Sequence, residues 1–138
     1  MRIALWLLAG LLLLAKTGCD TGNGRLGIEG TVTLDNNPLH DGAVSFLPMN
    51  GTSSPTAGGE ISNGIFSVKP DKGVMAGSYR VEIIATRKTG KQVMDPLMGT
   101  MVDEVIQYVP KKYNHESELT REVTSDGPNE FEFQLTSE

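Results

Sequence analysis

The chain has 138 residues, a formal net charge of −5 at pH 7 and a single cysteine. This acidity gives it no attraction to phosphate backbones or anionic headgroups, which argues against nucleic acid as a partner and against charge-driven membrane binding. One cysteine also excludes an intramolecular disulfide. The length suits one small domain with a single core.

The first segment, residues 1–18, has the features of an export signal. Arg2 precedes an almost unbroken apolar run over residues 3–15. This run is shorter than the roughly 20 residues that span a bilayer as a helix, but it has the length of a signal-peptide hydrophobic region. The alternative, a buried core helix, would need polar residues on one face, and the run has none. We therefore expect residues 1–18 to be a signal peptide.

The only cysteine, Cys19, directly follows Thr17 and Gly18. This spacing resembles a bacterial lipobox, in which small residues precede a cysteine that is diacylated and becomes the new N-terminus. Lys16 departs from that pattern, which prefers an apolar residue. The resemblance implies lipidation of Cys19, with each buried acyl CH₂ contributing about 0.8 kcal/mol to membrane anchoring. In enterobacterial sorting, Asp20 implies retention at the inner membrane. An ordinary signal peptide with an incidental cysteine is the alternative.

Residues 19–27 are rich in glycine and poor in apolar side chains, which predicts a flexible tether. From Ile28 onward, apolar residues recur at every second position, a pattern typical of half-buried strands. Seven short strands are predicted, at residues 28–34, 42–47, around 60–61, 65–68, 74–86, 119–124 and 129–136. Asn63-Gly64 predicts a tight hairpin between two of them. The pattern predicts an all-β fold, a seven-stranded antiparallel two-sheet sandwich.

The alternation also predicts which side chains face the core. The inward set comprises Ile28, Val32, Leu34, Val44, Phe46, Tyr79, Val81, Ile83, Ala85, Phe131, Phe133 and Leu135. Tyr113 is expected to pack its ring on the edge of the sandwich.

Residues 87–108 are long for a connection inside a compact sandwich. Residues 87–91 predict a solvated basic turn. Met98, Met101, Val102 and Val105 have helical spacing, so one short helix, or a long loop, is expected near 94–108, packed over the sheet with Asp103 and Glu104 outward. Alternatively, Met94, Met98 and Met101 could offer thioether ligands to Cu(I). Core packing is the preferred interpretation.

Several segments resemble the carboxypeptidase regulatory-like domain. They are residues 30–39 (GTVTLDNNPL), 42–48 (GAVSFLP), 64–67 (GIFS) and 77–83 (GSYRVEI). Residues 109–114, 117–123 and 131–135 resemble one bacterial lipoprotein branch of this family. The resemblance implies a transthyretin-like, seven-stranded sandwich over residues 28–136, used as an accessory or stalk module without catalytic residues.

Catalytic chemistry finds little support in the sequence. His40 and His115 are the only histidines, each in a predicted loop without metal-ligand spacing. Transthyretin-related hydrolases of 5-hydroxyisourate share the implied fold but need a C-terminal Tyr-Arg-Gly-Ser signature, whereas this chain ends FEFQLTSE. We predict a protein that is not an enzyme and has no catalytic residues and no cofactor.

The predicted function is a lipid-anchored, non-catalytic structural or interaction module of the cell envelope, facing the periplasm or the cell exterior. Its expected partners are the membrane, through the anchor, and an unknown envelope protein or polysaccharide. A sugar platform is disfavoured, because residues 19–138 contain no tryptophan. The alternative function is periplasmic copper handling through Met94, Met98 and Met101, which would then be metal ligands.

Overall fold

The computed structural model describes residues 23–138, in which every regular element is a β-strand or a short 3₁₀ helix. The elements are β1 (Ile28–Leu34), β2 (Asn37–Pro38), β3 (Asp41–Pro48), β4 (Ala57–Ser62), β5 (Ile65–Val68), η1 (Pro70–Lys72), β6 (Gly77–Ile84), β7 (Thr86–Met94), β8 (Met101–Gln107), η2 (Lys111–Tyr113), β9 (Thr120–Val123) and β10 (Glu130–Leu135). The predicted all-β class is confirmed. Among the described residues, no helix is long and apolar enough to cross a membrane.

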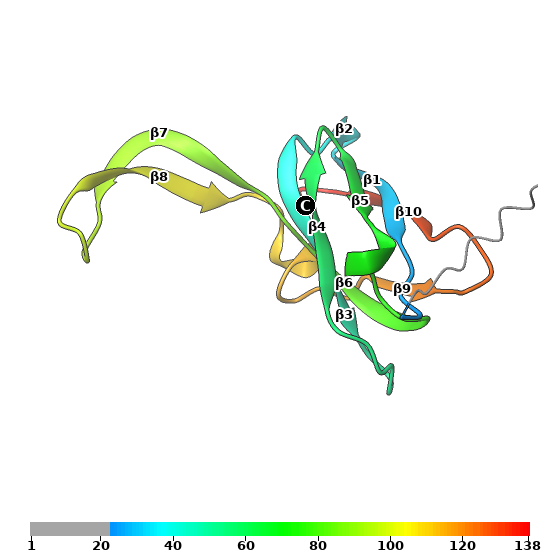
Figure 1. Cartoon of the computed structure of the whole chain (residues 1–138). Helices are drawn as coiled ribbons and strands as arrows, with labels where there is room; N and C mark the ends of the chain where they lie inside the picture. Colours follow the sequence, from blue (N-terminus) through cyan, green and yellow to red (C-terminus); the bar gives the residue numbers. More distant parts are fainter. Residues whose placement is uncertain (1–22) are drawn as a thin grey trace, which may run out of the picture.

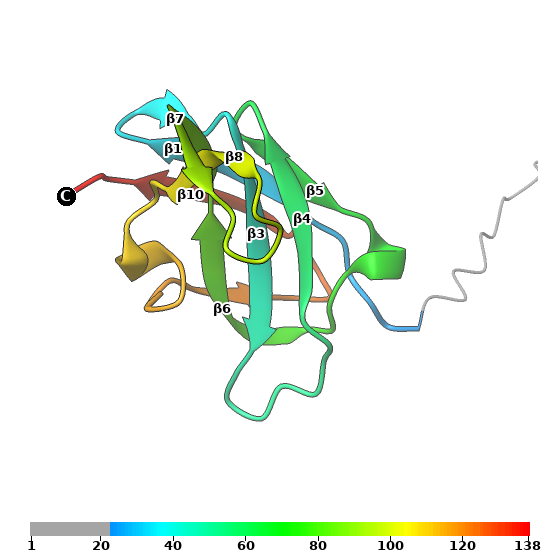
Figure 2. The same cartoon turned by 90° about the vertical axis from the view of Figure 1, so that its left-hand side faces the viewer.

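Eight strands form one sheet in the order β10-β1-β5-β4-β3-β6-β9, with the short β2 paired to β1. All neighbours in this sheet are antiparallel except β1 and β10, which run parallel. Figures 1 and 2 show that the sheet curls around a core to form the body of the molecule. The strands β7 and β8, which were not predicted, form a separate two-stranded sheet.

The curl brings side chains from distant strands onto one core. The ring centroids of Phe46 on β3 and Phe131 on β10 lie 6.0 Å apart, and those of Phe66 on β5 and Phe133 on β10 lie 6.1 Å apart. The hydroxyl of the buried Tyr79 donates to the carbonyl oxygen of Met75 at 2.7 Å. Each fully buried large apolar side chain contributes about 1.5–3 kcal/mol.

The predicted alternation of inward side chains is confirmed. Ten of the twelve expected residues are buried: Ile28, Val32, Val44, Phe46, Tyr79, Val81, Ile83, Ala85, Phe133 and Leu135. Leu34 and Phe131 are partly buried and pack against the same core, as does Tyr113, whose hydroxyl lies 3.2 Å from Oγ1 of Thr136.

The turn predicted at Asn63-Gly64 is confirmed. Ser62 and Ile65 are paired across it, and the φ angles of Asn63 and Gly64 are 49° and 79°. Positive φ at both central residues is what a type I′ turn requires, and Asn-Gly adopts it at low cost. This turn joins β4 to β5 and fixes their register.

The two end strands of the curled sheet, β9 and β10, are bridged by side chains. Nη2 of Arg121 on β9 donates to the carbonyl oxygen of Glu132 on β10 at 3.0 Å, and its guanidinium lies 4.6 Å from the ring centroid of Phe133. The side-chain amide of Asn129 makes two hydrogen bonds with the backbone of Thr124. Its Oδ1 accepts the N–H of Thr124 at 2.9 Å, and its Nδ2 donates to the carbonyl oxygen of Thr124 at 3.0 Å. These contacts cover part of the open edge of the sheet.

The folded region begins before the predicted first strand. The backbone N–H of Leu26 donates to the carbonyl oxygen of Val74 at 2.7 Å, and Leu26 packs against the core. Cys19, the predicted signal peptide and the start of the predicted tether lie outside the described residues.

Candidate functional site

The hairpin of β7 and β8, residues 86–107, projects from the body and is called the arm below (Figure 1). Its strands pair from Thr86 with Gln107 at the base to Met94 with Met101 near the tip. The nine residues of β7, at roughly 3.3 Å each, give the arm a length of about 30 Å. No residue of the arm belongs to the buried core. The arm therefore contributes no side chain to the buried core.

The helix or loop predicted near 94–108 is wrong, because most of this segment is strand. The four apolar residues at positions 98, 101, 102 and 105 have helical spacing, but the segment around them favours strands. Gly99, inside the expected helix, has a φ of 65°. The signal that would have identified the hairpin is a turn sequence, Asp95-Pro96 to Gly99, between two apolar runs. These runs contain the β-branched residues Val93, Val102, Val105 and Ile106.

The tip of the arm is a turn held by Asp95. Its Oδ1 accepts the backbone N–H groups of Leu97 at 2.8 Å and Met98 at 2.9 Å, and its carbonyl oxygen accepts the N–H of Gly99 at 2.8 Å. The hydrogen bonds from Met98 and Leu97 hold the pKa of the Asp95 carboxyl below its usual value. Asp95 is therefore ionised at neutral pH.

The expectation that the methionines pack in a core is wrong. Met94, Met98 and Met101 are 66%, 75% and 55% exposed. Met94 and Met101 are directly paired, so their side chains share one face of the arm, whereas Met98 lies in the turn. The structure thus places all three predicted methionines at the same end of the arm.

Exposed apolar side chains surround the end of the arm. Because side chains alternate along a strand, the pair Met94–Met101 lies on one face and the pair Val93–Val102 on the other. Leu97 in the turn is 94% exposed. The tip cluster is defined as Val93, Met94, Leu97, Met98, Met101 and Val102. Exposed apolar side chains therefore cover both faces and the end of the arm.

Below the tip cluster, the arm carries charged and polar residues of both signs. Nζ of Lys88 lies 2.7 Å from a carboxylate oxygen of Asp103, and Oγ1 of Thr89 donates to Glu104 at 2.5 Å. The contact with Asp103 raises the pKa of Lys88, and the same contact lowers the pKa of Asp103. The mid-arm belt is defined as Lys88, Thr89, Lys91, Asp103 and Glu104.

Two predictions about these belt residues are wrong. Residues 87–91 form part of β7 rather than a basic turn, and Asp103 and Glu104 do not share one outer face. As consecutive residues of a strand, Asp103 and Glu104 point to opposite faces of the arm. The belt therefore presents charge on both faces.

The base of the arm meets the body beside an open depression of about 650 Å³, called the base pocket below. Its lining includes the apolar Ile84, Tyr108 and Val109 together with the polar Glu82, Lys111 and His115. Ile84 is one of the few large apolar residues exposed on the body. The guanidinium of Arg87 lies 5.4 Å from the ring centroid of Tyr108. The base pocket thus offers an apolar surface next to the arm.

The two histidines lie on different loops of the body. Nδ1 of His40 is 2.7 Å from Asp41, and Nε2 of His115 is 3.4 Å from Glu116; both rings are largely exposed. Within residues 23–138, no group of three or more His, Cys, Asp and Glu side chains is placed to hold a metal ion.

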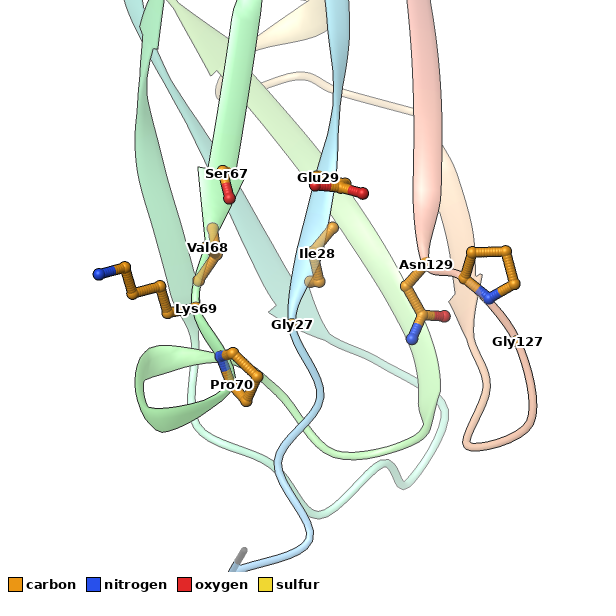
Figure 3. Close-up of a pocket in the computed structure, with 10 residues that line it drawn as sticks. Gly27, Ile28, Glu29, Ser67, Val68, Lys69, Pro70, Gly127 and Asn129 are labelled. Atoms are coloured by element: carbon orange, nitrogen blue, oxygen red, sulfur yellow. The ribbon is translucent and has the colours of Figure 1, made fainter. Parts of the chain in front are cut away.

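Another pocket, of about 380 Å³, lies at the end of the body where β1 begins (Figure 3). Its charged lining residues, Glu29 and Lys69, point in different directions, and Asn129 lies on the side of β10. These side chains do not form a pair that could act as general acid and base. The arm is therefore the most distinctive surface of the described chain.

No family model, curated protein or solved structure matches the chain. The assignment of a function therefore depends on the chemistry of its own residues.

Proposed function

We propose that this protein is a lipid-anchored, non-catalytic module of the cell envelope that binds another macromolecule through its arm. The observation that carries this proposal is the tip cluster, whose six apolar side chains are all exposed. Soluble proteins that expose a contiguous apolar patch generally use it for binding. A two-stranded hairpin is also only marginally stable alone, so a partner that covers the arm would stabilise it.

Export and anchoring are supported by the sequence of residues 1–19. In Figure 1, the described chain starts at the right of the body (blue), whereas the arm extends to the left. Cys19 lies only four residues before Asn23. An acyl anchor on Cys19 would therefore hold the body close to the bilayer.

The chemistry of the arm favours a partner in the envelope space over the anchoring bilayer. Two features of the arm agree with that choice. Asp95, ionised at the tip, would be costly to insert into lipid. The arm also lacks the tryptophan and tyrosine residues that are typical of membrane interfaces. An apolar tip without aromatic rings fits a protein better than a polysaccharide.

The fold family belongs to the same proposal. We place the body in the carboxypeptidase regulatory-like family, as a transthyretin-like sandwich of seven strands in two layers. The strand and turn pattern of residues 30–83 and the curl of the sheet support this placement. The arm would then be an addition between β6 and β9, and its binding role would be specific to this protein.

The proposal can be tested in intact cells with a photo-crosslinking residue at Leu97. The matched control carries the same residue at Lys72, which is exposed on the body. We expect a defined crosslinked product from position 97 and none from position 72, together with a diacylated N-terminal Cys19 in the mass spectrum. Equal labelling at both positions would reject binding by the arm, and an unmodified N-terminus would reject the anchor.

Copper handling is a second candidate, favoured by one observation. Met94, Met98 and Met101 are all exposed at one end of the arm, so packing no longer accounts for them. Soft thioether sulfur suits Cu(I) and Ag(I). Titration with Ag(I) should give saturable heat that the triple variant M94L/M98L/M101L loses, because leucine keeps the apolar surface without the sulfur. Absence of saturable heat in the unmodified protein would reject this function.

A further inference from the structure

We propose that the partner of the arm is a second copy of this chain, with the two arms antiparallel about a two-fold axis that passes near their mid-arm belts. This inference rests on the proposed function, since it names the macromolecule that the arm binds. A two-fold contact uses the same surface on both copies, so that surface must be complementary to itself. The arm and its base meet this requirement in charge and in geometry.

The distribution of charge separates the arm from the body. Three basic residues of the arm, Arg87, Lys88 and Lys91, are balanced by Asp95, Asp103 and Glu104, so the whole net charge of −5 lies outside the arm. Two acidic bodies in direct contact would repel each other. Antiparallel arms keep the bodies apart by about the 30 Å length of an arm, which exceeds the roughly 8 Å over which charges act at physiological salt. The neutral arm is thus the surface on which two copies meet at the lowest electrostatic cost.

The length of the arm brings its two apolar surfaces into register. When two equal arms lie antiparallel about their midpoints, the tip of each arm reaches the base of the other. The tip presents Leu97 and Met98, and the base presents the base pocket with the exposed Ile84. Each tip cluster then covers an apolar surface of the partner, and the contact forms twice in the dimer.

The mid-arm belt lies close to the proposed axis. Lys91 carries a positive charge for which no ion pair is seen within residues 23–138, and Asp103 and Glu104 are on the neighbouring strand. A two-fold axis near the belt brings the lysine of each arm toward the carboxylates of the other. Opposite charges in this arrangement favour one register and discourage slipped ones.

The surface offered by the arm and its base can be compared with that of known dimers. Specific interfaces bury about 800 Å² and engage roughly 20–30 residues on each partner. One face of the arm, residues 86–107, together with the lining of the base pocket would contribute to such a surface. Pairing also gives each two-stranded arm further strands or packing, which relieves its marginal stability.

The test uses two differently tagged full-length copies expressed together in cells, one carrying Leu97→Cys and the other Ile84→Cys. Both positions are outside the core, so the body should fold normally. Oxidation with diamide should give a mixed disulfide dimer that contains both tags. A matched pair that combines Leu97→Cys with Lys72→Cys, and a pair without introduced cysteines, should give none.

A second measurement compares the detergent-solubilised full chain with its Leu97→Asp variant by native mass spectrometry. We expect two copies for the unmodified protein and at least a tenfold weaker association for the variant, since a charge replaces a central apolar contact.

The remaining outcomes distinguish the inference from the proposed function. Crosslinking of Leu97→Cys to a different protein, with a monomeric mass, would overturn the second copy but keep binding by the arm. Absence of any product from Leu97→Cys would overturn both. A mixed dimer that forms equally well through Lys72→Cys would overturn the antiparallel arrangement.

Discussion

Removal of the arm should leave the body folded with nearly unchanged stability. The cleanest variant replaces residues 87–106 with Asn-Gly. Thr86 and Gln107 are directly paired, so a two-residue turn can close the chain between them. The variant keeps the Gln107 side chain, whose Oε1 accepts the N–H groups of Ala85 at 2.9 Å and Val109 at 3.3 Å.

The expected change in the free energy of unfolding follows from the exposure of the arm's side chains. The replaced segment contains none of the buried core residues, and its large apolar side chains are exposed in the single chain. We expect the free energy of unfolding to change by no more than about 1 kcal/mol, which is a shift in Tm of at most roughly 4–8 °C for a domain of this size. Phe46→Ala, in the centre of the core, should cost about 3–5 kcal/mol and serves as the reference.

Thermal unfolding followed by circular dichroism measures both variants. The scans need a series of protein concentrations, because loss of a dimer lowers the apparent Tm in a concentration-dependent way. At the lowest concentration, the curves of the armless and unmodified proteins should converge. If the armless variant unfolds as early as Phe46→Ala at every concentration, the arm is part of the folding unit and its separation from the core is wrong.

Two further predictions concern the backbone and the tip. Gly30→Ala should destabilise the body by about 1–3 kcal/mol, since its Cβ would overlap a backbone oxygen of β10; Gly127→Ala, where the nearest atom is 3.7 Å away, should be neutral in the same denaturant titration. The carboxylate of Asp95 should stabilise the turn fully above its unfolded pKa of about 3.9 and lose this effect as the pH falls through its lowered folded pKa. The amide resonances of Leu97 and Met98 should report that transition by NMR, and Asp95→Asn should abolish it; a midpoint at or above the usual value would contradict the turn geometry.

The strands of the body could be predicted because two independent signals agree there. In 28–34 and 129–136, apolar residues alternate with polar ones, interrupted only by Gly30, and one face is buried in the structure as expected. At Asn63-Gly64, the turn chemistry fixes the end of both neighbouring strands. In the turn after β1, Asp35 and Asn36 have positive φ angles, which these residue types tolerate.

The arm could not be predicted in the same way because both of its faces are exposed. A strand that buries one face shows alternation of apolar and polar residues, whereas Val93-Met94 and Met101-Val102 are adjacent apolar pairs. Such pairs fit a helical face equally well, and an interior position was the simplest explanation for so many apolar side chains. Their exposure depends on the arm projecting from the body, which no local pattern encodes.

The parallel pairing of β1 with β10 could not be predicted from local sequence either. These strands are far apart in the chain, and their contact depends on the curl of the whole sheet. No turn residue marks such a pairing, so only the three-dimensional structure could show it.

The guanidinium of Arg121, in the gap between β9 and β10, limits how this molecule can polymerise. The carbonyl oxygen of Glu132 is satisfied within the chain and is not free to recruit a strand from a neighbour. When many copies are crowded, cross-β growth from this side of the body is therefore obstructed.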